Sequence, residues 1–189
     1  MTNAEVVLSQ RNGGQFNRRV FCGMLALALA ACTQTIMPTE TAEGVSIRNV
    51  SVSTSELGQM SVRGLPISRQ QFATDLTTAI EREISSSRSS SGNANLYVSV
   101  TRVLLVSPEQ SFLVGGRSFI DAKVRVSRVS DGTLIAGPVV FSGLSDDVRM
   151  GGVVGAVTAP DARSDYEATV TGFAEMIREA MFEGGSTIY

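Results

Sequence analysis

The two cysteines of this chain, Cys22 and Cys32, are the first residues to consider for chemistry, and both lie in the stretch Asn17–Thr35. Two nearby cysteines can form a disulfide, ligate a metal, supply a reactive thiolate or mark a site of lipid attachment. The residues on either side of them favour the last of these alternatives.

The residues before Cys32 are arranged as in an export signal. Arg18 and Arg19 end a polar segment, and the apolar run Val20–Ala31 follows. This run has the length of a signal-peptide apolar region and is too short to span a bilayer as a helix. It ends in "LAAC", which resembles the bacterial lipobox: a branched apolar residue, two small residues and a cysteine. The alternatives are an ordinary signal peptide with a chance cysteine, or a short buried helix.

The resemblance to a lipobox implies a lipid anchor on Cys32. Cleavage between Ala31 and Cys32 would discard Cys22, and Cys32 would carry a diacylglycerol and a further acyl chain, with no other cofactor expected. Thr33 follows in place of an aspartate, which in the sorting pattern of such lipoproteins implies the periplasmic face of the outer membrane. The letters "NRRVF" also resemble a twin-arginine export motif, with an ordinary charged leader as the alternative.

Few residue types remain for catalysis. The chain has no His, so the common triads, His-ligated metals and the usual base near neutral pH are absent. It also has no G-x-S-x-G, P-loop or G-x-G-x-x-G motif. A Ser–Lys dyad would need Lys123, which we expect on the wet face of a strand. Asp146-Asp147 and Asp161/Asp165 could hold a hard cation, but they lack the spacing of an EF-hand loop. We therefore expect no catalytic residue, no metal and no enzyme.

The charge of the chain argues against nucleic acid as a partner. The formal net charge is −2, and loss of residues 1–31 removes three arginines and one glutamate, which leaves the remainder more acidic. No basic stripe is present.

Two strands and a helix are predicted in the first half of the remaining chain. Val45–Ser53 is rich in β-branched residues and predicts a strand, with an irregularity at Asn49 where the alternation shifts. Ser68 and Gln71 form a capping box that starts a helix ending near Ile84. Asn95–Val106 predicts a long central strand, since it is apolar on both faces near its end. The stretches between these elements, including residues 54–66, are expected to be loops.

A hairpin and a second helix are predicted in the second half. Apolar and polar residues alternate through "SFIDAKVRVSRV", and the Asp-Gly turn Ser130–Thr133 leads to a return strand. Pro138 places that strand at an edge or a bulge. Ser164 and Glu167 form a second capping box, and Gly184-Gly185 end the helix.

These elements predict an α+β fold in the order β-α-β-β-β-α. We expect two layers, a four-stranded mixed sheet with two helices on one face. Residues 1–31 form the signal peptide, 32–44 a lipidated tether and 45–189 a single periplasmic domain. The lipobox, the tether, the capped helix, the Ser-rich break at Ser85–Asn93 and the "AKVRV…DGTLI" hairpin together resemble small Gram-negative envelope lipoproteins. Their domain is similar to the N-terminal domain of TolB and to CsgG- and LpoB-type modules. The resemblance implies a fold and a location, and no functional residue.

One glycine-rich apolar segment, Met150–Pro160, is a candidate contact surface. Gly151, Gly152 and Gly155 would allow the backbone of a partner or of a second copy to approach closely. The alternative is a loop tucked over the core.

Three classes of function are weighed. The first is a non-enzymatic lipoprotein, anchored to the outer membrane, that binds another envelope protein. The second is an auxiliary lipoprotein subunit of an export or lipid/solute transport assembly, and the third is a carboxylate-based enzyme. A wet sheet face with an open edge would favour the first, an apolar groove between sheet and helices the second, and a cavity with two close acidic residues the third.

Overall fold

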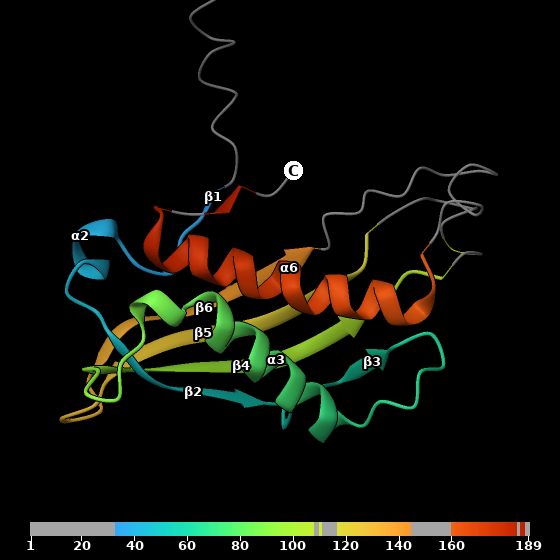
Figure 1. Cartoon of the computed structure of the whole chain (residues 1–189), viewed down its shortest axis with the longest axis horizontal. Helices are drawn as coiled ribbons and strands as arrows, with labels where there is room; N and C mark the ends of the chain where they lie inside the picture. Colours follow the sequence, from blue (N-terminus) through green and yellow to red (C-terminus); the bar gives the residue numbers. More distant parts are fainter. Residues whose placement is uncertain (1–32, 108–109, 111–116, 145–159, 185, 188–189) are drawn as a thin grey trace, which may run out of the picture. The chain divides into compact units, whose positions relative to one another are not determined.

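The computed structural model describes residues 33–107, 110, 117–144, 160–184 and 186–187 (Figure 1). The elements are β1 (Thr33–Gln34), α2 (Thr39–Ala42), β2 (Ile47–Ser53), β3 (Gln59–Ser61), α3 (Arg69–Glu83), the 3-10 turn η1 (Ser85–Ser87), β4 (Ala94–Leu104), β5 (Phe119–Arg128), β6 (Leu134–Leu144), α6 (Ala162–Phe182) and β7 (Ser186–Thr187). Among these residues, no helix is both long and apolar enough to cross a bilayer.

The predicted α+β architecture is confirmed. A mixed sheet has the order β2-β4-β5-β6, with β2 parallel to β4 and the two later pairs antiparallel. The register of β2 shifts between Ile47 and Asn49, as the sequence indicated. A fifth strand, β3, was not predicted: residues 59–61 lie in the expected loop and pair with the end of β4. The hairpin turn is formed as expected, with Gly132 at φ 71° and Asp131 accepting the Thr133 amide.

Helix α3 begins at the predicted residue. The Ser68 side chain accepts the Gln71 amide at 3.1 Å, which satisfies one of the free N–H groups of the first turn. The reciprocal half of the capping box is not formed, because the Gln71 amide group donates to Asp75 at 2.7 Å instead. The apolar stripe of α3 is buried and comprises Phe72, Leu76, Ala79 and Ile80.

Helix α6 begins earlier than the sequence indicated. Asp161, not Ser164, is the N-cap, and its carboxylate accepts the amides of Arg163 and Ser164 at 2.9 and 3.1 Å. Ser164 therefore lies inside the first turn, and its hydroxyl donates to the same carboxylate. An aspartate has two acceptor oxygens and its charge favours a helix N-terminus, which explains its preference over the serine. One face of α6 is buried and carries Tyr166, Val170, Phe173, Ile177, Ala180 and Met181.

The core lies between one face of the sheet and the two long helices (Figure 1). The alternation in β5 places Ile120, Ala122, Val124 and Val126 in this core, all fully buried. Phe141 of β6 packs edge-on against Phe173 of α6, with ring centroids 5.7 Å apart. This close approach of α6 to β6 requires Gly143, because a Cβ at that position would lie 2.4 Å from the Phe173 ring.

The stretch that follows Cys32 is packed on the domain, in contrast to the expected tether. Ile36 and Met37 are 4% and 1% exposed, and the Ile36 amide donates to the Ala180 carbonyl at 2.9 Å. Residue 33 pairs with residue 187 across a small antiparallel sheet of β1 and β7. The polar composition of residues 33–44 suggested a free linker, but its two adjacent apolar residues are enough to fix it to the C-terminal end of α6.

Candidate functional site

Several candidate residues from the sequence lie outside the described part of the chain. These are Ala31 and Cys32, the glycines Gly151, Gly152 and Gly155, and the pair Asp146-Asp147. The lipid anchor and the glycine-rich contact surface therefore stay predictions.

Lys123 lies where its alternation placed it, on the sheet face opposite the helices. Its side chain is 48% exposed and its ammonium group forms an ion pair with Glu56 at 2.5 Å. A solvated, paired ammonium is not the buried amine that a Ser–Lys base requires.

Asp161 and Asp165, which could have held a cation together, have separate structural tasks. Asp161 caps α6, and its pKa lies below the ordinary range because the Ser164 hydroxyl and the Ser164 and Arg163 amides donate to its carboxylate. Asp165 is fully buried one turn later. Across the described ranges, no three carboxylate, thiol or imidazole side chains come together as a metal site would require.

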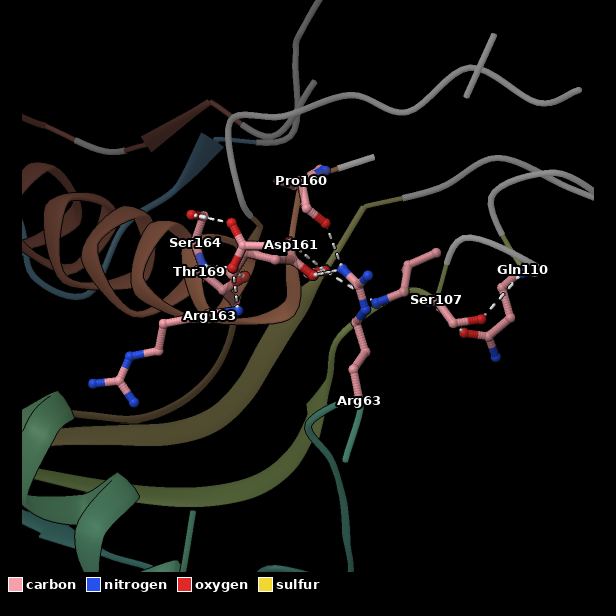
Figure 2. Close-up of polar contacts among 11 residues, drawn as sticks. Arg63, Ser107, Gln110, Pro160, Asp161, Arg163, Ser164 and Thr169 are labelled. Atoms are coloured by element: carbon pink, nitrogen blue, oxygen red, sulfur yellow. Dashed lines mark hydrogen bonds and ion pairs between the residues drawn. The ribbon is translucent and has the colours of Figure 1, made fainter. Parts of the chain in front are cut away.

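The buried Asp165 belongs to a polar cluster with Arg63 and Ser118. The Ser118 hydroxyl lies 2.9 and 3.0 Å from the two carboxylate oxygens. Arg63 Nη1 lies 3.5 Å from the carboxylate and donates to the Pro160 carbonyl at 3.0 Å. Figure 2 shows the Arg63 guanidinium pointing toward the first turn of α6, below Pro160. The Val106 amide donates to Ser118, so the cluster joins segments from four parts of the chain.

Arg63 is held in a conformation that is unusual for its residue type. Its φ is 53°, in the left-handed region that costs free energy for residues other than glycine. Its side chain is only 12% exposed, so the ion pair with Asp165 and the bond to Pro160 fix both the side chain and the turn. Nothing in the sequence predicted this contact, because the two partners lie in a loop and a helix that are far apart along the chain.

The second candidate site is the sheet face that carries no helix, which we call the open face. Both long helices pack on the other side of the sheet. Pairing in the sheet places Tyr97 opposite Arg125, Ser99 opposite Lys123, and Lys123 opposite Val140. The alternation in β5 predicted the polar residues of this face, but not their neighbours from β4 and β6.

Arginines lie over aromatic rings at two places on the open face. The Arg125 guanidinium lies 4.6 Å from the centre of the Tyr97 ring, and that of Arg102 lies 4.5 Å from the Phe119 ring. Arg102 also forms an ion pair with Asp121 at 2.7 Å. Such cation–π contacts hold long side chains flat against the sheet, so this face is ordered and amphipathic.

The β6 edge adds apolar surface to the open face. Val140 is 67% exposed and Leu134 is 49% exposed, which is uncommon for large apolar residues in the described part of the chain. In that part, β6 pairs with β5 alone. Pro138 lies in this edge strand, preceded by Gly137 at φ 81°, as the sequence predicted for an edge or a bulge.

A pocket of about 760 Å³ lies beside β2 and the end of α3. Its lining is polar: Arg48, Asn49, Glu81, Ser85, Arg88, Ser89 and Ser90. Glu81 is the acidic residue among these described lining residues, and it forms an ion pair with Arg88 at 2.6 Å. Among the described residues, this lining thus offers neither the two close carboxylates of an acid/base pair nor the large apolar side chains of a lipid site.

No family of known proteins matches the chain, and no curated protein matches it. Among solved structures, one similar protein is a "putative lipoprotein" from Caulobacter crescentus, with 17% identity and a TM-score of 0.37, covering 75% of this chain and 92% of that one. Another is a PelC dodecamer from Paraburkholderia phytofirmans, with 9% identity and a TM-score of 0.36, covering 76% and 91%. At these TM-scores neither protein contributes to the arguments that follow.

Proposed function

We propose that the chain is an exported lipoprotein, anchored through acyl chains on Cys32 to the periplasmic face of the outer membrane. Its domain is a non-enzymatic module that binds another envelope protein through the open face. The observation that carries this proposal is the open face, where arginines lie over aromatic rings beside the exposed Val140.

The proposed anchor rests on the sequence around Cys32. The apolar run Val20–Ala31 ends in two small residues directly before the cysteine. Two or more acyl chains on one residue hold a protein stably at a bilayer, whereas a single chain is marginal.

The composition of the open face supports protein binding. Arginine and aromatic side chains are enriched at protein interfaces, and aromatic rings bury large areas with little loss of conformational freedom. The Tyr97–Arg125 and Phe119–Arg102 contacts supply such groups, and Val140 supplies an exposed apolar side chain near the β6 edge. The charged groups on this face include both signs, which suits a protein partner better than a polyanion.

The chemistry of the described side chains supports a non-enzymatic role. Asp161 caps a helix, and Asp165 accepts from Ser118 and pairs with Arg63. Lys123 forms an exposed ion pair. Each of these three charged groups therefore has a structural partner or a partner at the surface.

Site-specific photo-crosslinking in intact cells tests the proposal. A benzoylphenylalanine at the position of Val140 should yield one discrete adduct, and the same probe at exposed Thr74, on the outer side of α3, serves as the matched control. Adducts from Thr74 but not from Val140 would show that the open face is not the binding surface. An adduct with a subunit of a transport assembly would favour the second class of function.

The anchor is tested separately with Cys32→Ala. The variant should lose incorporation of labelled palmitate and should be absent from the outer-membrane fraction. Equal labelling of the variant and the parent chain would refute lipidation at Cys32.

A further inference from the structure

The geometry points to a domain that is held directly against the bilayer, with no flexible spacer, by the side formed by β1, α2 and the C-terminal end of α6. This inference rests on the proposed lipidation of Cys32. It specifies the surface that meets the membrane, whereas the proposed function specifies only the anchor.

The first step is the distance along the chain between anchor and fold. Thr33 is covalently joined to Cys32 and is the partner of Thr187, while Gln34 is the partner of Ser186. Consecutive Cα atoms are about 3.8 Å apart. An acylated Cys32 would therefore begin one peptide unit from a paired strand.

The second step is the strength with which this segment is fixed. Met37 and Ile36 are 1% and 4% exposed and belong to the main core cluster. The Ile36 amide bonds to the Ala180 carbonyl near the end of α6, and Thr35 donates to the Gly184 carbonyl. Releasing the segment would expose both apolar side chains and leave these backbone groups to water, so the packed arrangement is strongly favoured.

The third step is a comparison with a free linker. If residues 33–44 were a flexible coil, their root-mean-square reach would be about 20 Å, and the domain would move widely above the membrane. Because the segment is folded, that reach falls to the single peptide unit before Thr33. The headgroup region must then contact the surface next to β1.

Electrostatic attraction to anionic headgroups does not explain the contact between this side of the domain and the membrane. Glu40 and Glu43 lie in and directly after α2, and Glu183 at the end of α6 pairs with Arg178. Anionic headgroups attract clusters of Lys and Arg, and this side of the domain does not offer a basic excess among its described residues. The contact should therefore persist at high salt, because the covalent anchor enforces it.

The position of the anchor also orients the rest of the domain. Figure 1 shows β1 beside α6, with α3 and β2 on the other side of that helix. A bilayer at β1 leaves the β2 edge of the sheet directed away from the membrane.

Quenching of a single tryptophan tests the inference, because the native chain contains no Trp. Acylated mature protein is placed in phosphatidylethanolamine/phosphatidylglycerol vesicles that contain brominated lipid. Thr35→Trp, beside the anchor, and Glu43→Trp, directly after α2, are at exposed positions of this side and should lose most of their emission, whereas Ser51→Trp, exposed on β2, should lose little. The quenching should not change between low and high salt.

The matched control inserts a Gly/Ser spacer of about twelve residues between Cys32 and Thr33, which should restore most of the Thr35→Trp emission. Equal quenching with and without the spacer, or no quenching at either proximal probe, would overturn the inference while leaving the anchor in place. Mass spectrometry of the N-terminal peptide distinguishes the two failures, since an unacylated Cys32 would refute the proposed function itself.

Discussion

Replacing Asp165 by Asn removes the charge from the buried cluster while preserving size and the ability to accept the Ser118 hydroxyl. Arg63, with a side chain 12% exposed, then has no counter-charge in this contact. Removal of one partner from a buried ion pair costs about 3–5 kcal/mol. Because Arg63 keeps some access to water and its bond to Pro160, we expect about 3 kcal/mol for Asp165→Asn. We expect a similar loss for Arg63→Met, which leaves the fully buried Asp165 without this cation.

The double variant is the informative one. When both charges are removed, neither is left buried without its partner, so the two losses should not add. We expect the loss of unfolding free energy in the double variant to be about 2 kcal/mol smaller than the sum of the two single losses. The matched control is the ion pair Arg163–Glu167, in which Nε lies 2.7 Å from the carboxylate and the side chains are 63% and 62% exposed. The same cycle with Arg163→Met and Glu167→Gln should give a coupling of only about 0.3–0.5 kcal/mol.

Urea unfolding followed by circular dichroism measures all of these free energies, in a chain that also carries Cys32→Ala to exclude acyl chains. The slope of unfolding free energy against urea should stay unchanged among the variants. If the Arg63 and Asp165 losses add to within about 0.5 kcal/mol, or if the buried and exposed pairs couple equally, the cluster is not the cooperative contact that its burial and distances indicate.

Three further perturbations test the packing and the helix ends. Asp161→Ala should lower the melting temperature at neutral pH. The pKa of Asp161 is lowered in the folded state, so the ionised carboxylate stabilises the fold. The difference in melting temperature between variant and parent chain should therefore be present at pH values above the ordinary aspartate pKa, and it should vanish as pH falls through the folded-state pKa. Ser68→Ala should cost about 0.5–2 kcal/mol in urea unfolding by removing the cap of α3, and an unchanged midpoint would show that water replaces the cap without loss. Gly143→Ala should lower the free energy of unfolding by about 1–3 kcal/mol, because its Cβ would lie 2.4 Å from Phe173. The control Gly44→Ala, whose Cβ would lie 3.9 Å from the nearest atom, should change the unfolding free energy little. Equal losses in the two variants would contradict the steric explanation.

Local sequence patterns predicted the elements whose conformation is decided by nearby residues. Alternation identified β5 and its wet face, and the S-x-x-Q pattern located the start of α3 at Ser68. The Asp-Gly turn and Pro138 identified the hairpin and its edge strand. In each case the hydrogen bond or the buried face lies within a few residues of the signal.

Patterns failed where distant parts of the chain decide the structure. Residues 59–61 form a strand because they pair with residues 102–104 of β4, beyond the point where β2 ends. The composition of residues 59–61 alone is that of a loop and does not indicate this pairing. Ile36 and Met37 are buried by α6, a partner that no local rule identifies. The contact of Arg63 with Asp165 depends in the same way on a turn and a helix that meet only in the folded domain.

The pairing of Thr33 with Thr187 also sets the order in which the domain can be completed. Ile36 and Met37 are buried against α6, which follows them by more than 120 residues, so Met37 stays exposed during synthesis until α6 has left the ribosome. Contacts between the two ends of a chain form late, because their loop-closure entropy is large. An N-terminal segment that docks last is open to modifying enzymes while the rest of the domain folds, and it is closed to them afterwards.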